Sequence, residues 1–262
     1  MCLSVSLRLC EGNMVFRFFI CVLGIIAAKT LCAQNVTGVE ETGILYKHTR
    51  SVGLFIHTRG FGANYRFGVN ETGYRSAQWD FALFTMRHPK EIRSVNPFSD
   101  NAGGYVYGKL NSPIFLHTGW GKRFILDAKG DKGGIELGYS LYGGVSWALI
   151  KPVYLNVYYF DDNFGVREQT ERYDPQKHYP DNISGRAPFT IGLFESTFSA
   201  GAYLEGALQF EFGRQQKQLR MIEVGASADF LARPLQIMAN NPQERLFFNL
   251  FIRLMYGKLW NR

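Results

Sequence analysis

Charged side chains of both signs recur at alternate positions of segments whose other positions are apolar. They are Arg66, Asp80, Arg123, Glu136, Glu205, Glu223, Asp229 and Arg253. Guanidinium and carboxylate groups on one face of several strands can pair with one another, or they can line a polar channel. In a narrow interior we expect pairing, because an unpaired buried charge is costly. We therefore predict a charge network that serves the structure, and the alternative is a narrow pore for small solutes.

The five histidines are the candidates for hydrolytic chemistry, which needs a His beside a Ser, Asp or Glu. His178 lies in a long segment with Asp162 and other aspartates, which resembles in outline the Asp and His pairs of omptin-type proteases. His57 and His117 lie at the same alternate positions of their predicted strands as the charged residues, and we interpret them as polar side chains that fill the interior. The chain has no His-x-Ser pair, no Gly-x-Ser-x-Gly, no phosphate-binding loop and no metal-ligand spacing. We therefore predict no catalytic, cofactor-binding or metal-binding residue, and a rim-located protease or lipid-modifying enzyme is the least favoured alternative.

Alternation with a period of two residues is the main structural signal, and it is typical of β-strands with one apolar face. In the segment 133–150 the odd positions are apolar, whereas the even positions are small or polar and include Glu136. The same pattern recurs in the segments 198–212 and 246–260. Trp260 is followed by only two residues, so the last segment partly resembles the C-terminal signal of outer-membrane proteins. These segments predict long strands.

The pattern predicts an all-β, antiparallel transmembrane β-barrel of about ten strands, within a range of about eight to twelve. The predicted strands are 51–60, 61–70, 76–87, 104–110, 113–126, 133–150, 152–160, 198–213, 218–231 and 245–260. Short turns are expected at 70–75, 111–112, 151 and 214–217, and long connections at 88–103, 127–132, 161–197 and 232–244. Short turns at one rim and long extracellular loops at the other are typical of bacterial barrels, whose chain ends are then periplasmic.

The first 33 residues are typical of an export signal behind a short leader. Arg17 precedes an apolar run, and a small residue, Ala33, marks the expected cleavage site, with Met14 as the expected start. The apolar run is too short for a helix that spans a membrane of about 30 Å, which disfavours a single anchor. All four cysteines lie in this region. We expect residues 34–262 to form one barrel domain without disulfides.

A soluble β-sandwich or lipocalin-like barrel is the structural alternative, but it would turn its apolar face inward and show a polar exterior. Aromatic side chains near the predicted strand ends suit either a sugar-binding platform or the girdles at the membrane interfaces, which we favour. They are Trp147, Tyr154, Tyr158, Tyr159, Phe160 and Trp260.

The charge balance gives no sign of nucleic-acid binding. Removal of residues 1–33 takes three of 29 basic and one of 22 acidic side chains, so the formal charge falls from +7 to +5. The basic residues are scattered instead of forming the one-faced stripe that phosphate backbones need. We predict no nucleic-acid partner.

Three segments resemble an uncharacterised family of small outer-membrane β-barrels from Bacteroidota: Ser51 to Gly68, His88 to Arg93 and Tyr105 to Asn111. The resemblance implies the bacterial outer membrane, with the lipid bilayer, lipopolysaccharide and the barrel-insertion machinery as partners. It brings no catalytic residues. Together with the absence of a pore or active-site pattern, it suggests a structural or accessory protein, and we hypothesise a subunit of an assembly or secretion complex that contacts other proteins through 161–197.

Overall fold

The computed structural model describes residues 46–96, 103–127, 134–160, 166–212 and 218–261. The predicted leader and signal peptide, with Met14, Ala33 and all four cysteines, lie outside the described residues. In the part of the chain that is described, no helix has the length and apolar character to cross a membrane.

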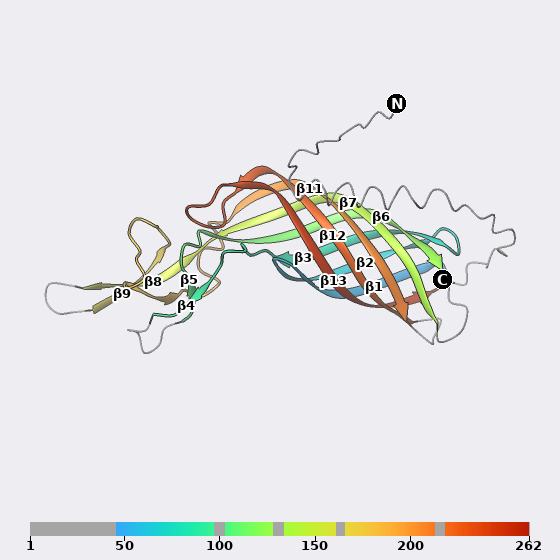
Figure 1. Ribbon diagram of the computed structural model, residues 1–262, viewed down its shortest axis with the longest axis horizontal. Helices are drawn as coiled ribbons and strands as arrows, with labels where there is room; N and C mark the ends of the chain where they lie inside the picture. Colours follow the sequence, from blue (N-terminus) through green and yellow to red (C-terminus); the bar gives the residue numbers. More distant parts are fainter. Residues whose placement is uncertain (1–45, 97–102, 128–133, 161–165, 213–217, 262) are drawn as a thin grey trace, which may run out of the picture. The chain divides into compact units, whose positions relative to one another are not determined.

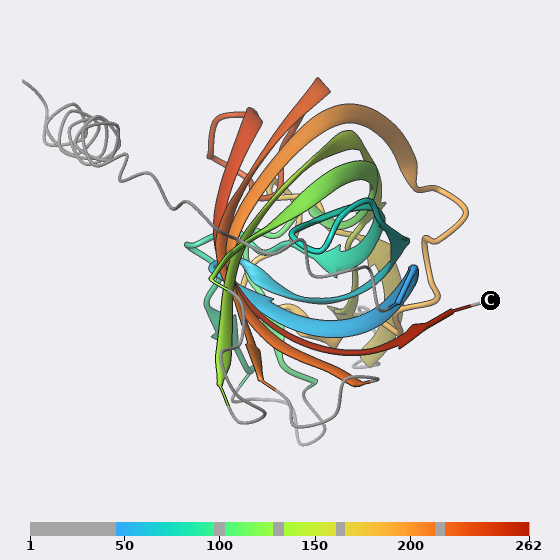
Figure 2. The same ribbon diagram turned by 90° about the vertical axis from the view of Figure 1, so that its right-hand side faces the viewer.

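Eight antiparallel strands form a closed barrel in the order β1-β13-β12-β11-β7-β6-β3-β2. Their bounds are β1 (His48–His57), β2 (Gly60–Asn70), β3 (Arg75–Thr85), β6 (Asn111–Asp127), β7 (Ile135–Pro152), β11 (Thr197–Phe212), β12 (Gln218–Leu235) and β13 (Glu244–Trp260). The ring closes because β1 pairs with β2 on one side and with β13 on the other (Figure 2). Closure gives every barrel strand two neighbours and leaves no open sheet edge.

The all-β antiparallel barrel is confirmed, but the prediction of ten strands is wrong by two. Only Tyr105–Val106 of the expected strand 104–110 is extended, as β5, which pairs with β4 (Arg93–Ser94). The chain then turns at Gly108, whose φ of 82° favours glycine. The expected strand 152–160 forms β8 (Tyr154–Phe160), but it pairs with β9 (Val166–Arg172) and β10 (Ile183–Arg186) in a separate three-stranded sheet.

The connections differ in length between the two rims of the barrel. Residues 71–74, 128–134 and 213–217 connect strands at one rim, where β1 also begins and β13 ends, with His48 opposite Trp260. The other rim carries the tight turn at 58–59 and the segments 86–110, 153–196 and 236–243. The turns predicted at 111–112 and 151 are wrong, because these residues lie within β6 and β7. The connection predicted at 127–132 consequently belongs to the short-turn rim.

The described parts of 86–110, 153–196 and 236–243 pack together, and we call them the rim cap. β4, β5, β8, β9 and β10 all belong to it (Figure 1). Buried side chains from two of its segments share one small apolar core, which contains Tyr105, Val153, Leu155, Val157, Tyr173 and Ile183. The third segment joins through Leu110, whose N–H donates to the carbonyl of Ile237 at 2.9 Å. The rim cap is thus a folded structure.

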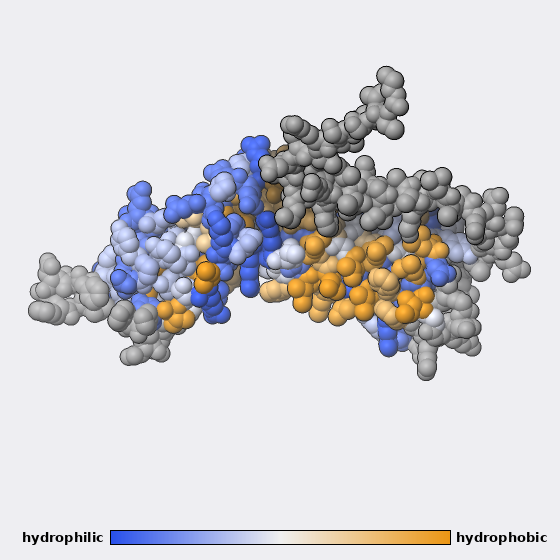
Figure 3. Space-filling view, viewed as in Figure 1, coloured by the Kyte–Doolittle hydropathy of each residue, from blue (hydrophilic) through white to orange (hydrophobic). Residues whose placement is uncertain are grey.

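The two faces of the barrel strands have opposite character. On β13 the outward side chains are apolar and exposed, from Leu246 at 64% to Tyr256 at 57%, whereas Arg253 between them is 1% exposed. Apolar side chains gather over the barrel strands in Figure 3, while the rim cap is largely hydrophilic. Most exposed large apolar side chains of the described chain lie on barrel strands. The apolar face is therefore the outside of the barrel and the polar face its lumen.

Candidate functional site

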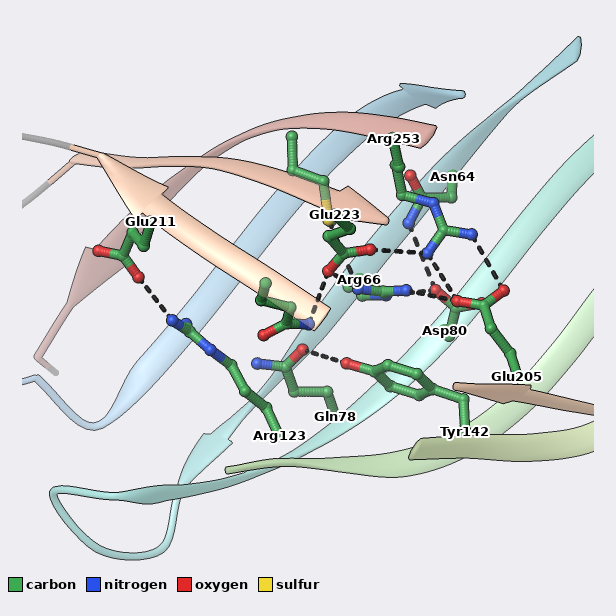
Figure 4. A network of polar contacts seen from close by, with 12 residues as sticks. Asn64, Arg66, Gln78, Asp80, Arg123, Tyr142, Glu205, Glu211, Glu223 and Arg253 are labelled. Carbon is green, nitrogen blue, oxygen red and sulfur yellow. Dashed lines mark hydrogen bonds and ion pairs between the residues drawn. The ribbon is translucent and has the colours of Figure 1, made fainter. Parts of the chain in front are cut away.

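Arg66 lies at the centre of the lumen and binds carboxylates from three other strands (Figure 4). Its Nε donates to Asp80 Oδ1 on β3 at 2.5 Å. Its two terminal nitrogens donate to Glu223 on β12 at 2.5 Å and to Glu205 on β11 at 3.0 Å. Arg66 and all three carboxylates are at most 5% exposed. One guanidinium group on β2 therefore links β3, β11 and β12 through the interior.

A second guanidinium group reaches the same carboxylates from β13. Arg253 donates to Glu205 Oε1 at 2.7 Å and Oε2 at 3.0 Å, a bidentate pair, and to Glu223 Oε2 at 2.9 Å. Charge-assisted, bidentate pairs of this type are among the strongest hydrogen bonds in proteins. Two cations and three carboxylates thus form one central network across five strands.

Aromatic rings and glycines fix the position of this network. The Arg66 guanidinium lies 4.2 Å from the ring centroid of Tyr142, whose hydroxyl donates to Gln78 at 2.8 Å. Gly121 lies beneath the Tyr142 ring, and a Cβ there would collide with it. A Cβ at Gly119 would likewise collide with the hydroxyl of Tyr203. Inward-facing glycines on β6 therefore leave the space that the lumen tyrosines occupy.

A separate group of charges lies toward the short-turn rim. Arg123 on β6 donates to Glu136 on β7 and to Glu211 on β11, each at 2.7 Å. Arg123 and Glu211 are 7% exposed, and the side chain of Glu136 is 14% exposed. These residues are more accessible than the central network because they lie nearer the rim.

A third group lies on the rim-cap side of the central network. His117 Nε2 lies 2.5 Å from Asp229 Oδ1, and the hydroxyl of Ser146 donates to the same oxygen at 2.8 Å. The His117 ring stacks on Tyr203 with centroids 3.8 Å apart and an interplanar angle of 11°. The ring of His117 therefore interacts with a carboxylate inside the barrel. His57, nearer the rim, has Nε2 3.1 Å from the carbonyl of Thr85.

Inward-facing aromatic side chains fill the rim-cap end of the lumen. Phe84 stacks on Phe115 with centroids 5.3 Å apart, and Phe115 meets Phe247 edge-on at 6.1 Å. The buried members of this apolar cluster, which we call the lumen plug, are Phe55, Ala82, Phe84, Met86, Phe115, Ala148, Ala207, Leu231, Leu235, Ile237, Met238, Phe247 and Phe251. Ile237 and Met238 come from the connection between β12 and β13. The plug therefore packs across the rim-cap end of the lumen.

The space between the plug and the central network is small. A cavity lined by His57, His117, Glu205, Ser227 and Asn249, with aromatic walls, leaves about 10 Å³ for the centres of water molecules. Such a volume corresponds to about one water. Side chains therefore occupy nearly all of the described lumen at this depth.

The structure places the eight predicted lumen residues in three groups. Arg66, Asp80, Glu205, Glu223 and Arg253 form the central network, Arg123 and Glu136 form the second group, and Asp229 belongs to the third. Sequence reasoning missed Glu211 as a partner of Arg123 and missed the lumen plug. Both could have been predicted from the alternation of inward and outward positions. Glu211 lies on the same strand face as Glu205, and Phe251 lies on the same strand face as Arg253.

His178 does not form a catalytic arrangement with its described neighbours. It is fully buried in the rim cap, where its Nδ1 accepts the backbone N–H of Asp174 at 3.0 Å and its Nε2 lies 3.4 Å from Glu171. Asp162 lies outside the described residues. Tyr173 contacts the His178 ring, and burial raises the pKa of Tyr173 to about 12. Nowhere in the described ranges do three or more His, Cys, Asp or Glu side chains gather as a metal site would require.

The predicted aromatic girdle is wrong for Tyr154, Tyr158 and Tyr159, and it stays a prediction for Trp147 and Trp260. Trp147 lies on the outer face of β7, where its ring contacts Phe198 at 5.7 Å, and Trp260 ends β13. Tyr154, Tyr158 and Tyr159 belong to β8 in the rim cap, outside the barrel wall. They cannot form a girdle around the barrel.

Neither a protein-family model nor a curated protein matches the chain. Among solved structures it is similar to Neisserial surface protein A, at 7% identity and a TM-score of 0.36, over 81% of this chain and 96% of that one. It is also similar to Ail, the attachment invasion locus protein of Yersinia pestis, at 10% identity and a TM-score of 0.36, over 82% and 99%. We therefore infer function from the side chains of the chain itself.

Proposed function

We propose that this protein is an integral outer-membrane β-barrel with a closed lumen, which serves as a structural or accessory component and not as a conduit. The observation that carries the proposal is the inverted distribution of side chains. The outside of the barrel is apolar, while Arg66, Arg253 and their carboxylates occupy the inside. Only a closed barrel or a helix satisfies its backbone within lipid.

The outer face supports a lipid environment over a soluble one. Leu54 on β1 lies opposite Leu254 on β13, which lies opposite Ile222 on β12, so neighbouring strands present a continuous apolar surface. Leu54 is 68% and Leu254 61% exposed. Soluble monomers rarely expose apolar patches larger than a few hundred square ångströms. In a membrane the same surface contacts acyl chains, so its apolar side chains are not exposed to water.

Single cysteines test this placement, because all four native cysteines precede residue 34. A fluorophore on Ile252→Cys, on the outer face of β13, should be quenched by lipids that carry a quencher deep in the acyl chain. A fluorophore on Tyr179→Cys, in the rim cap, should escape this quencher and should be attached by an impermeant reagent on intact cells. Equal quenching at both sites would reject the membrane placement, and no labelling of Tyr179→Cys on intact cells would reject an external rim cap.

The lumen disfavours the alternative of a narrow pore. The plug and the central network follow one another along the barrel, and both are made of buried side chains. An interior of about eight strands is only wide enough for side chains to fill. For the hydrolase alternative, the candidate residue His178 is buried in the rim cap, where its described partners are Asp174 and Glu171.

For the accessory role, we propose that the rim cap contacts partner proteins at the outer surface, with lipopolysaccharide and the barrel-insertion machinery as the other partners. Its three-stranded sheet, in the order β10-β8-β9, lies within the segment 161–197 and just before it. The segments that resemble a Bacteroidota barrel family support the same setting. Cross-linking from Tyr179→Cys in native membranes should capture a defined outer-membrane protein. Recovery of the barrel alone, beside intact assembly complexes, would contradict a role in such a complex.

A further inference from the structure

A second concave site lies outside the lumen, within the rim cap and beside the ends of β3, β6 and β7. Its cavity of about 330 Å³ is of the size that holds small ligands. The walls come from two connections, one after β3 and one after β7. Its charged lining residues are Arg87, Glu91, Arg93, Lys109, Lys151 and Arg186. We call this cavity the basic cleft.

The charges of the basic cleft do not balance. Glu91 is bound to Lys109, whose Nζ lies 2.7 Å from its Oε2. Within the described ranges, no carboxylate forms an ion pair with the other four lining cations, which are Arg87, Arg93, Lys151 and Arg186. The described lining thus carries five positive charges and one negative charge, a net charge of +4. Such a concentration of charge in a concave wall attracts anions.

Lys151 is the buried member of this set and points to a ligand. It is 5% exposed, and its Nζ lies 5.0 Å from the ring centroid of Phe189. Among the described residues, its hydrogen-bond partner is the carbonyl of Pro152 at 3.3 Å. An ammonium group has three donors, and a buried cation without a counter-charge is costly. An anion in the cleft would supply acceptors and a compensating charge.

The backbone around the cleft brings arginines from both connections together. The N–H of Arg186 donates to the carbonyl of Gly103 at 3.3 Å, which joins the second connection to the first. Arg93 lies against Gly104, where a Cβ would collide with its guanidinium group. A Cβ at Gly185 would likewise collide with Gly103. The close packing of these glycines therefore holds the arginines beside one cavity.

We propose that the basic cleft binds a phosphorylated monosaccharide. A phosphate monoester carries a charge of about −1.5 to −2 near pH 7 and offers three strong acceptor oxygens. Arginine binds phosphate in a bidentate fork, and lysine binds it as a point charge. The cavity is larger than a phosphate ion, and the rings of Tyr154 and Phe189 in its wall suit the apolar face of a sugar.

Titration calorimetry on the refolded barrel in detergent, free of lipopolysaccharide, tests the proposal with glucose 6-phosphate as the probe. We expect binding of glucose 6-phosphate, no heat from glucose, and weaker binding of inorganic phosphate. Arg186→Gln and Lys151→Gln should each weaken binding by about tenfold or more, because each removes a charge-assisted contact. Arg233→Gln and Lys177→Gln are the matched controls, since both native side chains are exposed and lie outside the cleft.

Arg186 is exposed, so Arg186→Gln keeps the test valid if Lys151→Gln fails to fold. The proposal is overturned if glucose and glucose 6-phosphate bind alike, if neither binds, or if the cleft variants match their controls. Competition identifies the source of the ligand. Displacement of the probe by lipopolysaccharide, but not by dephosphorylated lipopolysaccharide, would assign the cleft to phosphorylated sugars of the membrane. If the probe binds and lipopolysaccharide does not displace it, the cleft would be assigned to free sugar phosphates.

Discussion

Arg66 and Arg253 donate to the same oxygen atom, Oε1 of Glu205, at 3.0 and 2.7 Å. The two arginines come from β2 and β13, which lie on either side of β1 in the barrel. Their positive charges would repel each other without the carboxylates of Glu205 and Glu223 between them. The opposite charges of the central network therefore compensate one another within the lumen.

Removal of one arginine should destabilise the whole barrel. Arg253→Met retains packing against Phe55 and Phe251 but leaves Glu205 and Glu223 with one cation in place of two. We expect a loss of about 3–5 kcal/mol in the free energy of unfolding, the usual effect of breaking a buried ion pair. Urea unfolding in micelles, followed by tryptophan fluorescence, measures it. The exposed Arg233→Met should change stability by less than about 0.5 kcal/mol. Equal stability of both variants would contradict the network.

A methyl group at Gly119 should also destabilise the barrel. Its Cβ would meet the hydroxyl of Tyr203 and the carbonyl oxygen of Gly143. We expect Gly119→Ala to cost about 1–3 kcal/mol in urea unfolding, as overpacking does. Gly143→Ala is the control, because its Cβ faces outward and would first meet a side-chain methyl of Leu204 at 3.0 Å. If the two variants were equally stable, the tight packing of Tyr203 over β6 would be wrong.

A charge on the outer face separates a membrane barrel from a soluble one. Ile252→Arg places a cation in the middle of the apolar positions of β13, at a side chain that is 58% exposed. In a bilayer we expect it to cost about 2–4 kcal/mol in the free energy of folding into vesicles. At an exposed site of a soluble protein the same change would cost about 0.5 kcal/mol or less. Tyr179→Arg in the rim cap should be neutral in vesicles.

Tyr173 should make the rim cap sensitive to alkaline pH. Burial raises its pKa to about 12, whereas a tyrosine in an unfolded segment ionises near pH 10. The neutral phenol thus contributes stability below about pH 10, and this contribution is lost as the pH rises toward about 12. The difference in tyrosinate absorbance between the native chain and Tyr173→Phe should titrate near pH 12. A midpoint near pH 10 would show that Tyr173 is not buried.

The barrel strands were largely predictable because alternation reports which face is buried. On β13, Asn249 and Arg253 point inward, whereas Leu250 and Ile252 point outward, as their parity predicts. Alternation does not report which strand pairs with which. Val153, Leu155 and Val157 alternate as well as any barrel strand, yet they are buried in the core of the rim cap.

The wrong assignment of the segment 152–160 to the barrel has a physical cause. The prediction needed the chain to reverse at Lys151 alone, whereas tight hairpin turns take two residues or more. Lys151 instead continues β7, and β8 begins at Tyr154 within another sheet. The pairing of Glu205 with two arginines was also beyond prediction, because strand tilt and register decide which inward residues reach one another across the lumen.

Planar-bilayer recording tests whether a continuous path for ions runs through the barrel. The refolded native chain should insert without steady unitary conductance, because the plug around Phe115 and Phe247 and the network around Arg66 both close the lumen. A porin recorded in the same bilayer serves as the positive control. Reproducible unitary steps from the native chain, with a reversal potential that follows the salt gradient, would contradict the closed lumen.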